Sequence, residues 1–310
     1  MKRIIPVICL ALVAVCAVLS VFVYRATTTN DVSRPSEESS LIVHSSSEES
    51  TSSVVSTPSK PNYSVAFTEN SNPKNWNVKW DIISVGSIIN TYSRPEKITF
   101  GDASEYNQVQ GITTFRGNNY RTGATFGETV IINKTLTTKW TKSISSLKWT
   151  GCGWTGQPLV VQWDDETKAI MNLYDSKKSK EGLVEVIYAT LDGKVHFYDM
   201  EDGKETRKPI DIGMNFKGAG ALDPRGYPLL YVGGGLYTNG LVPRMFIVNL
   251  ITGEIIYRHG HKETFHERDW IAFDSSPLVD AETDTLIWPG ESGILYTMRL
   301  NAEYDRAAGQ

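Results

Sequence analysis

The stretch RHGHKETFHERD, residues 258–269, carries the densest set of side chains that could bind a metal. It holds His259, His261 and His266 together with three carboxylates. A His-x-His pair on a β-strand places both imidazoles on one face, and a third histidine would complete a zinc or copper site. The same composition is typical of a solvated loop after an apolar strand. We expect the loop, and we predict no catalytic, cofactor-binding or metal-binding residue.

A second polar stretch, TTFRGNNYRTG at residues 113–123, places Arg116 and Arg121 beside Gly117 and Gly123. Cationic side chains and glycine amides are groups that could hold an anion. Anion sites of this kind lie at a helix N-terminus or in a nest of successive amides. No helical pattern follows the stretch, so we interpret it as a turn that leads toward a strand.

Cysteine chemistry is limited because Cys9 and Cys16 lie in the apolar N-terminal segment and leave Cys152 alone in the polar region. No disulfide framework can form there. We expect Cys152 to be a small buried packing residue, because no histidine can be placed near it to activate a thiolate.

The motif LDPRGYP, residues 222–228, has Pro224 and Gly226 at positions typical of a tight turn. We expect Asp223 and Arg225 to act locally within it. The sequence contains no glycine-rich phosphate loop that opens a helix, no nucleophile elbow and no zinc-protease helix.

The amino-acid composition indicates which secondary-structure elements position these residues. The chain has 310 residues and a net charge of −4, which does not provide the basic face that nucleic-acid binding requires. It is rich in aromatic residues, with 8 Trp, 14 Tyr and 10 Phe, and Val, Ile and Thr recur in short runs. These features favour an all-β protein.

The N-terminus predicts export. Residues 4–24, from Ile4 to Tyr24, are uncharged and long enough to span a bilayer. Lys2 and Arg3 precede them, so we predict a signal-anchor helix at residues 1–25 with everything after Arg25 extracytoplasmic. A cleaved signal peptide is the alternative, and it exports the chain equally. The predicted location is the cell membrane, with a single pass.

Two segments follow this helix. Residues 26–61 are rich in Ser, Thr and Glu and predict a disordered stalk. Residues 62–110 predict a small antiparallel β unit, because Trp76, Val78 and Trp80 alternate with polar residues and a turn is expected at Val85-Gly86.

Residues 111–310 contain a loose repeat. Each unit begins with a small-residue and proline segment, at 156–158, 218–224 and 275–277. Each also contains strands separated by turn glycines, which we align at Gly203, Gly253 and Gly309. Four-stranded units of about 40–50 residues are typical of β-propeller blades. Unrelated hairpins in a β-sandwich are the alternative.

Several blocks carry a family resemblance over about residues 72–300: FRGNNYRTGA, TTKWTKSI, GQPLVV, YATLDGKVHFYD, FIVNLITGEIIYR, DPRGYPLLYVGGG and FDSSPLVDAETDTLIWPGESGILYT. They resemble the pyrroloquinoline-quinone-binding-like β-propeller repeat proteins, in particular the secreted or membrane-anchored members of Gram-positive bacteria. The resemblance implies a partial β-propeller of four-stranded blades, preceded by the small β unit, the stalk and the transmembrane helix. Because a full propeller of this family has more blades than residues 111–310 supply, we expect a chain truncated at its C-terminus.

The resemblance also bears on individual residues. It implies that FRGNNYRTG opens the first blade, that Asn118 and Asn119 tolerate the turn geometry, and that Arg116 and Arg121 bond to backbone carbonyls. The family name suggests pyrroloquinoline quinone and Ca²⁺ as cofactors. Trp288 or Trp270 could be offered as a stacking floor for the quinone, but no neighbouring motif supports either, and the chain lacks adjacent cysteines. We predict no cofactor.

These observations favour an extracytoplasmic, membrane-tethered β-propeller that acts as an interaction scaffold for a protein or glycan of the cell envelope, and not for nucleic acid. The alternative is a quinoprotein-like or glycan-acting enzyme whose site is completed by the missing blades.

Overall fold

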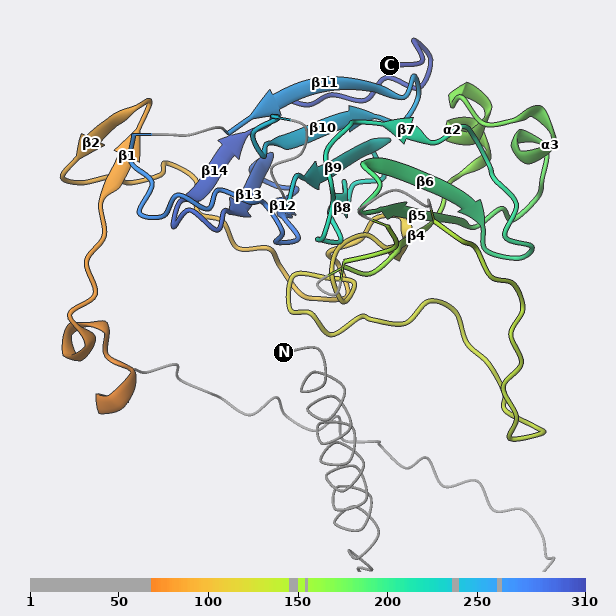
Figure 1. Ribbon diagram of the computed structural model, residues 1–310, viewed down its shortest axis with the longest axis horizontal. Coiled ribbons are helices and arrows are strands. Elements are labelled where there is room, and N and C mark those ends of the chain that lie inside the picture. The colour runs from red at the N-terminus through yellow and green to blue at the C-terminus, as the bar shows by residue number, and fades with distance from the viewer. Residues whose placement is uncertain (1–67, 145–149, 154–155, 236–239, 261–263) are drawn as a thin grey trace, which may run out of the picture. The chain divides into compact units, whose positions relative to one another are not determined.

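The computed structural model describes residues 68–144, 150–153, 156–235, 240–260 and 264–310. The chain divides into two compact units, residues 1–79 and 80–310. Within the described residues, no helix has the length and apolar character needed to cross a membrane. The predicted membrane helix at residues 1–25 and the whole predicted stalk at residues 26–61 lie outside those residues (Figure 1).

The described part of the first unit is helical rather than extended. It forms two 3₁₀ helices, η1 (Glu69–Ser71) and η2 (Pro73–Trp76). The Asn72 side chain caps the second helix, and Asn77 ends it in the left-handed region with φ 50°. The strand predicted through Trp76 is therefore wrong. A cap before the tryptophan and a left-handed residue after it interrupt the alternation on which that prediction rested.

The second unit begins with a short hairpin. Strands β1 (Ile82–Ser84) and β2 (Ser87–Ile89) pair antiparallel. The predicted turn is confirmed, since Val85 and Gly86 both have positive φ, 48° and 77°, as a two-residue hairpin turn requires. Residues 96–100 form no strand.

The segment after the hairpin is held by the far end of the chain. The Arg94 guanidinium donates to Thr285 Oγ1 at 2.7 Å, and the Phe100 amide donates to Asp280 Oδ1 at 3.2 Å. These bonds to partners distant in sequence replace the strand pairing that sequence alternation predicted.

Three antiparallel sheets then follow in chain order, and all their neighbouring strands pair antiparallel. The first has the order β3-β4-β5-β6-β7, the second β11-β10-β9-β8 and the third β12-β13-β14. Two short helices, α2 (Asp165–Ile170) and α3 (Asp175–Lys178), connect β4 to β5. The strands are β3 (Gln110–Ile112), β4 (Leu159–Gln162), β5 (Glu185–Ala189), β6 (Lys194–Asp199), β7 (Ile210–Asp211), β8 (Ala221–Leu222), β9 (Leu229–Gly233), β10 (Met245–Asn249), β11 (Glu254–His259), β12 (Leu278–Asp280), β13 (Thr285–Pro289) and β14 (Leu295–Arg299).

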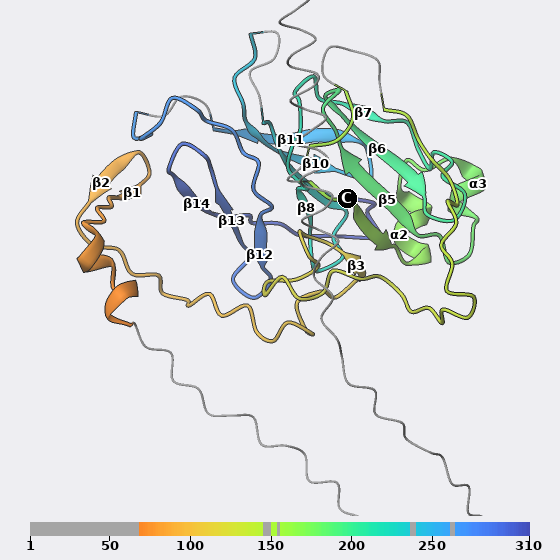
Figure 2. The same ribbon diagram turned by 60° about the horizontal axis from the view of Figure 1, so that its bottom comes forward.

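The three sheets stack face to face, with the second sheet in the middle (Figures 1 and 2). Successive side chains of a strand point to opposite faces. On β9, Leu230 and Val232 pack with the first sheet, whereas Tyr231 packs against Trp288 of the third. Both faces of β9 and β10 are thus buried, which explains their continuous apolar sequences, whereas the edge strand β11 is largely exposed. The all-β prediction is confirmed, and closure into a propeller stays a prediction.

The turn glycines are equivalent in two sheets but not in the third. Gly203 donates its amide to the Asp199 carbonyl at 2.8 Å, and Gly253 donates to the Asn249 carbonyl at 2.7 Å. Each turn follows directly on its strand. Gly309 lies in a turn well beyond the end of β14, so the predicted alignment of this third glycine is wrong.

Candidate functional site

The segments that precede β4, β8 and β12 contact one another at glycine residues. A Cβ at Gly218 would lie 2.2 Å from the carbonyl oxygen of Asp274, and a Cβ at Gly153 would lie 2.4 Å from Lys217 Cα. Only glycine permits backbones to approach this closely. The contact brings together Lys217 and Asp274, which occupy the same position relative to β8 and β12, four residues before each strand.

Lys217 and Asp274 form an ion pair through Nζ and Oδ2. The Lys217 ammonium also lies 5.7 Å from the centre of the Trp270 ring, within the range of a cation–π contact. The Asp274 side chain is 9% exposed, and among the described residues its buried Oδ1 finds no hydrogen-bond donor. A buried, unsatisfied carboxylate oxygen is costly and often marks a functional site.

The electrostatics of this group are unusual. Burial raises the pKa of Asp274 to about 6, against the opposing effect of Lys217. The nearby Glu291 carboxylate raises it further, because two negative charges resist each other. A carboxyl group with a pKa near neutrality can exchange a proton under physiological conditions.

Asp274 lines a surface cavity of about 560 Å³. This volume lies in the range of small-ligand sites. The cavity is formed by the segment that precedes β12, by the turn between β13 and β14, and by the loop of residues 115–123, here called the FRGNN loop. Its lining residues are Phe115, Arg121, Asp274, Ser275, Ser276, Pro289, Gly290 and Glu291.

The FRGNN loop is held by Arg121. Its guanidinium donates to the carbonyl oxygens of Phe115 at 2.9 Å and Ser276 at 3.1 Å, and to Thr114 Oγ1 at 2.8 Å. Burial lowers the pKa of Arg121. The predicted bonding to backbone carbonyls is confirmed for Arg121. The Arg116 side chain is exposed instead.

The asparagines of the loop do not act as predicted. The left-handed positions are Arg116 at φ 56° and Arg121 at φ 60°, not Asn118 or Asn119. Asn118 acts through its side chain, because Oδ1 accepts the amides of Tyr120 and Thr122, each at 3.0 Å. Such Asx bonding stabilises a turn without requiring positive φ at the asparagine.

The three histidines are not shown to meet. His259, at the end of β11, packs edge-on against Tyr296 with ring centres 5.4 Å apart. His266 Nε2 lies 3.4 Å from Asp269, and His261 lies outside the described residues. In the part of the chain that the structure describes, no cluster of three or more His, Cys, Asp or Glu side chains could hold a metal.

Cys152 is exposed, so its predicted role as a buried packing residue is wrong. It lies in the glycine-flanked segment that precedes β4, where the chain passes over Tyr188. Burial, together with a hydrogen bond to the Cys152 thiol, raises the pKa of Tyr188.

Arg225 forms hydrogen bonds both within its own turn and outside it. It pairs with Asp223 through two bonds of 2.8 and 2.7 Å, as expected for a local role. It also donates to Asp284 at 2.7 Å, in the turn between β12 and β13. The purely local prediction is therefore wrong, because the same guanidinium ties the second sheet to the third.

The two tryptophans offered for quinone stacking have other contacts. Trp288 is fully buried and meets Phe273 edge-on with ring centres 6.3 Å apart. Trp270 is 40% exposed, and Lys217 lies over its ring. A stacked quinone needs an open indole face, so Trp288 does not fit that role.

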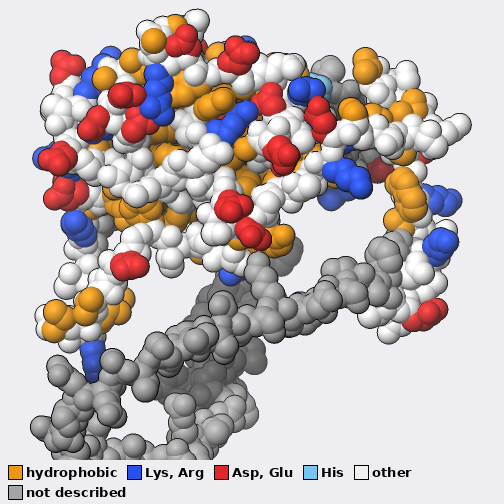
Figure 3. Space-filling model, turned by 180° about the vertical axis from the view of Figure 1, so that it is seen from behind, with side chains coloured by type: hydrophobic (Ala, Val, Ile, Leu, Met, Phe, Trp, Pro, Cys, Tyr) orange, Lys and Arg blue, Asp and Glu red, His pale blue; other side chains and the backbone are white. Residues whose placement is uncertain are grey.

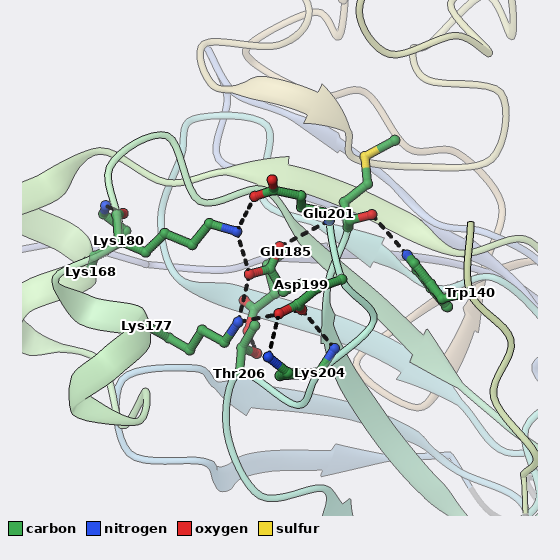
Figure 4. A network of polar contacts seen from close by, with 11 residues as sticks. Trp140, Lys168, Lys177, Lys180, Glu185, Asp199, Glu201, Lys204 and Thr206 are labelled. Atoms are coloured by element: carbon green, nitrogen blue, oxygen red, sulfur yellow. Dashed lines mark hydrogen bonds and ion pairs between the residues drawn. The ribbon is translucent and has the colours of Figure 1, made fainter.

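A second charged network lies at the end of β6 (Figure 4). Asp199 accepts hydrogen bonds from the Lys177 and Lys180 ammonium groups, both at 2.6 Å. Burial alone would raise the pKa of Asp199, but the two lysines outweigh it and hold the pKa below its ordinary value. This network fastens α3 and the following loop to the first sheet, and its geometry indicates a structural role.

The residues of the cavity were not predicted as a site. Lys217 and Asp274 each stand directly before one of the small-residue segments, so aligning those segments would have placed them at one position. No sequence signal points to Glu291, because its place depends on how the third sheet folds back.

Comparison with known proteins gives little further constraint. No protein-family model matches the chain, and no curated protein matches it. Among solved structures, the crystal structure of BamB from Moraxella catarrhalis matches with 21% identity and a TM-score of 0.26. The match covers 41% of this chain and 35% of the BamB chain. A similarity this low assigns no activity.

Proposed function

We propose that this protein is an interaction scaffold of the cell envelope: a propeller-like stack of β-sheets, tethered outside the membrane by its N-terminal segment, which binds a protein partner at the cavity beside Asp274. The tether rests on the uncharged residues 4–24 behind Lys2 and Arg3. The observation that carries the binding role is the convergence of three segments, distant in sequence, on one cavity with a buried, unsatisfied carboxylate oxygen.

The surface supports a protein partner rather than a polyanion. Acidic and basic side chains are interspersed over the face seen in Figure 3. Such a mixed surface gives no extended field of one sign, which nucleic-acid binding would require.

A site-specific photo-crosslink tests the proposal. A photoreactive amino acid replaces Phe115, which lines the cavity and is 38% exposed, in the full chain expressed in cells. The same replacement at Tyr92, which is 57% exposed and outside the cavity, is the control. We expect one protein to crosslink from position 115 only, and to bind the purified chain saturably. Equal products from both positions, or none, would count against the scaffold, and a crosslinked glycan would replace the protein partner.

A glycan-acting enzyme is the second candidate, favoured by the raised pKa of Asp274 beside Glu291. Paired carboxyl groups of different pKa are the usual apparatus for cleaving glycosidic bonds. Incubation of the full chain with purified cell-wall glycans should then release reducing ends, and Asp274→Asn should abolish that release. The absence of release across glycan classes would remove this candidate.

A further inference from the structure

The β1-β2 hairpin carries an exposed apolar surface. Ile83 and Ile88 lie opposite each other on the two strands, on the same face, and are 37% and 56% exposed. Val85 at the turn is fully exposed, and Trp80, just before β1, is 72% exposed. Single apolar residues scattered over a surface are ordinary, but a group of them on one small element marks an interaction surface.

No other strand covers or extends this hairpin. Among the described residues, β1 and β2 form a sheet of their own and pair only with each other. The hairpin lies apart from the three stacked sheets in both ribbon views (Figures 1 and 2). A hairpin of two strands is only marginally stable in water unless something packs against it. A surface outside the protein that buried the face of Ile83 and Ile88 would therefore stabilise it.

The charges near the hairpin indicate a surface without net charge. Asp81 and Glu96 are negative, Arg94 and Lys97 are positive, and residues 80–97 are neutral overall. A protein partner that is selected by charge requires an excess of one sign on the matching surface. The zwitterionic surface of a phosphatidylcholine bilayer has no such requirement.

The types of exposed side chain suit a bilayer surface. Tryptophan is enriched at the membrane–water interface, and aliphatic side chains enter the boundary between headgroups and acyl chains. The outer edges of β1 and β2 carry backbone groups without a strand partner among the described residues, and hydrocarbon does not tolerate such groups. The contact must therefore be shallow, at the level of the headgroups.

The chain also brings the hairpin to a membrane. The predicted anchor ends at Arg25, and residues 26–79 connect it to Trp80. A tether of this kind raises the effective concentration of the bilayer at the hairpin, so a contact that is too weak to hold the free protein is sufficient.

We propose that the β1-β2 hairpin is a second, peripheral contact with the membrane that holds the predicted anchor. Ile83, Val85 and Ile88 enter the interfacial region, and Trp80 lies at the level of the headgroups. This inference rests on the tether in the proposed function and is independent of the cavity beside Asp274.

Quenching by lipid tests the contact directly. The full chain, with its three native cysteines replaced by serine, carries Val85→Cys labelled with an environment-sensitive fluorophore and is incorporated into phosphatidylcholine vesicles. We expect blue-shifted emission that brominated phosphatidylcholine quenches. The quenching should persist at high salt, because the segment has no net charge. The matched control is Leu136→Cys with the same label, since Leu136 is also aliphatic and is 96% exposed but lies outside the hairpin. It should not be quenched.

Variants of the two faces locate the contact. Ile83→Ser combined with Ile88→Ser should shift the equilibrium at least about tenfold toward the released hairpin and so remove the quenching at position 85. Ser84→Thr combined with Ser87→Thr changes the opposite face and should leave the quenching unchanged. The comparison of positions 85 and 136 keeps both isoleucines, so it decides the question even if the serine variant loses the hairpin.

Three results would overturn the inference. Equal quenching at positions 85 and 136 would indicate general adsorption to lipid. Blue-shifted emission that brominated lipid does not quench would place the hairpin against a second copy of the chain. Unshifted emission would leave the hairpin to a protein partner.

Flotation of the vesicles after an alkaline carbonate wash separates this inference from the tether. Flotation that resists the wash, without quenching at position 85, would preserve the tether and refute the hairpin contact. Quenching in a chain that the wash removes would preserve the hairpin contact and refute the tether. A chain that does not float before the wash would refute both.

Discussion

Two buried carboxylates of this protein differ in how completely their oxygens are hydrogen-bonded. Glu185 on β5 is fully buried and fully bonded: Arg207 donates to both of its oxygens, at 3.0 and 2.7 Å, and Trp163 Nε1 donates at 3.0 Å. The remaining Arg207 donors reach Leu250 and Asn172 in turn. Among the described residues, Asp274 has one ion-pair partner and a buried oxygen without a donor, and it lines a cavity.

The difference separates structural from functional charge. A buried ion pair that satisfies all its groups ties elements together, here β5, the loop after β6 and the turn between β10 and β11. An ion pair that leaves one carboxylate oxygen unsatisfied does not offset the cost of desolvating that oxygen. Such a pair is expected where a ligand or a proton satisfies the oxygen. Mutations at the two sites should therefore differ in magnitude.

The largest effect should come from breaking the complete pair. Arg207→Met leaves the Glu185 carboxylate buried without its main donor, and should lower the free energy of unfolding by about 3–5 kcal/mol in urea denaturation. The matched control is the double replacement Glu185→Leu with Arg207→Met, which removes both charges and should recover part of that loss. A single variant within about 1 kcal/mol of the original protein would show that this pair is not the fastening we infer.

Asp274 should make the stability of the fold depend on pH. Its pKa in the folded state is raised to about 6 from the ordinary 3.8, so the folded protein holds the proton more tightly than the unfolded chain. The stabilisation is complete below pH 3.8 and is lost as the pH rises through about 6, with an upper limit of about 3 kcal/mol. In Asp274→Asn this loss should be absent, so the stability difference between the two proteins should change across this range. A difference independent of pH would contradict the raised pKa.

Asp199 should titrate with the opposite sign. Lys177 and Lys180 hold its pKa below the ordinary value of 3.8, so its ionised form stabilises the fold above that pH. The stability that Asp199→Asn removes at pH 7 should shrink as the pH falls from 3.8 through the lower pKa of the folded state, where the folded carboxylate becomes protonated too. Chemical denaturation of both proteins at several pH values measures this. If the stability contributed by Asp199 and by Asp274 changed with pH in the same direction, the two carboxylates would not belong to different kinds of site.

Local chemistry explains which of these features the sequence could predict. The Val85-Gly86 turn and the turns at Gly203 and Gly253 depend on residues close in the chain, and they were predictable. The strand through Trp76 failed because Asn72 and Asn77 stabilise a competing local structure. The Asp274 site depends on glycine contacts between the opening segments of different sheets, and no local pattern encodes the proximity of Glu291.

The smallest effects should separate the two arginines of the FRGNN loop. Arg121→Gln removes the charged donors to Phe115 and Ser276 and should lower the free energy of unfolding by about 1–2 kcal/mol. Arg116→Gln changes an exposed side chain at a left-handed position that either residue must adopt, so its effect should stay within about 0.5 kcal/mol. Thermal unfolding of the two variants side by side provides the measurement. If Arg116→Gln proved the more damaging, the loop would be held by contacts other than the carbonyl bonds of Arg121, and this part of the cavity wall would have to be assigned to different residues.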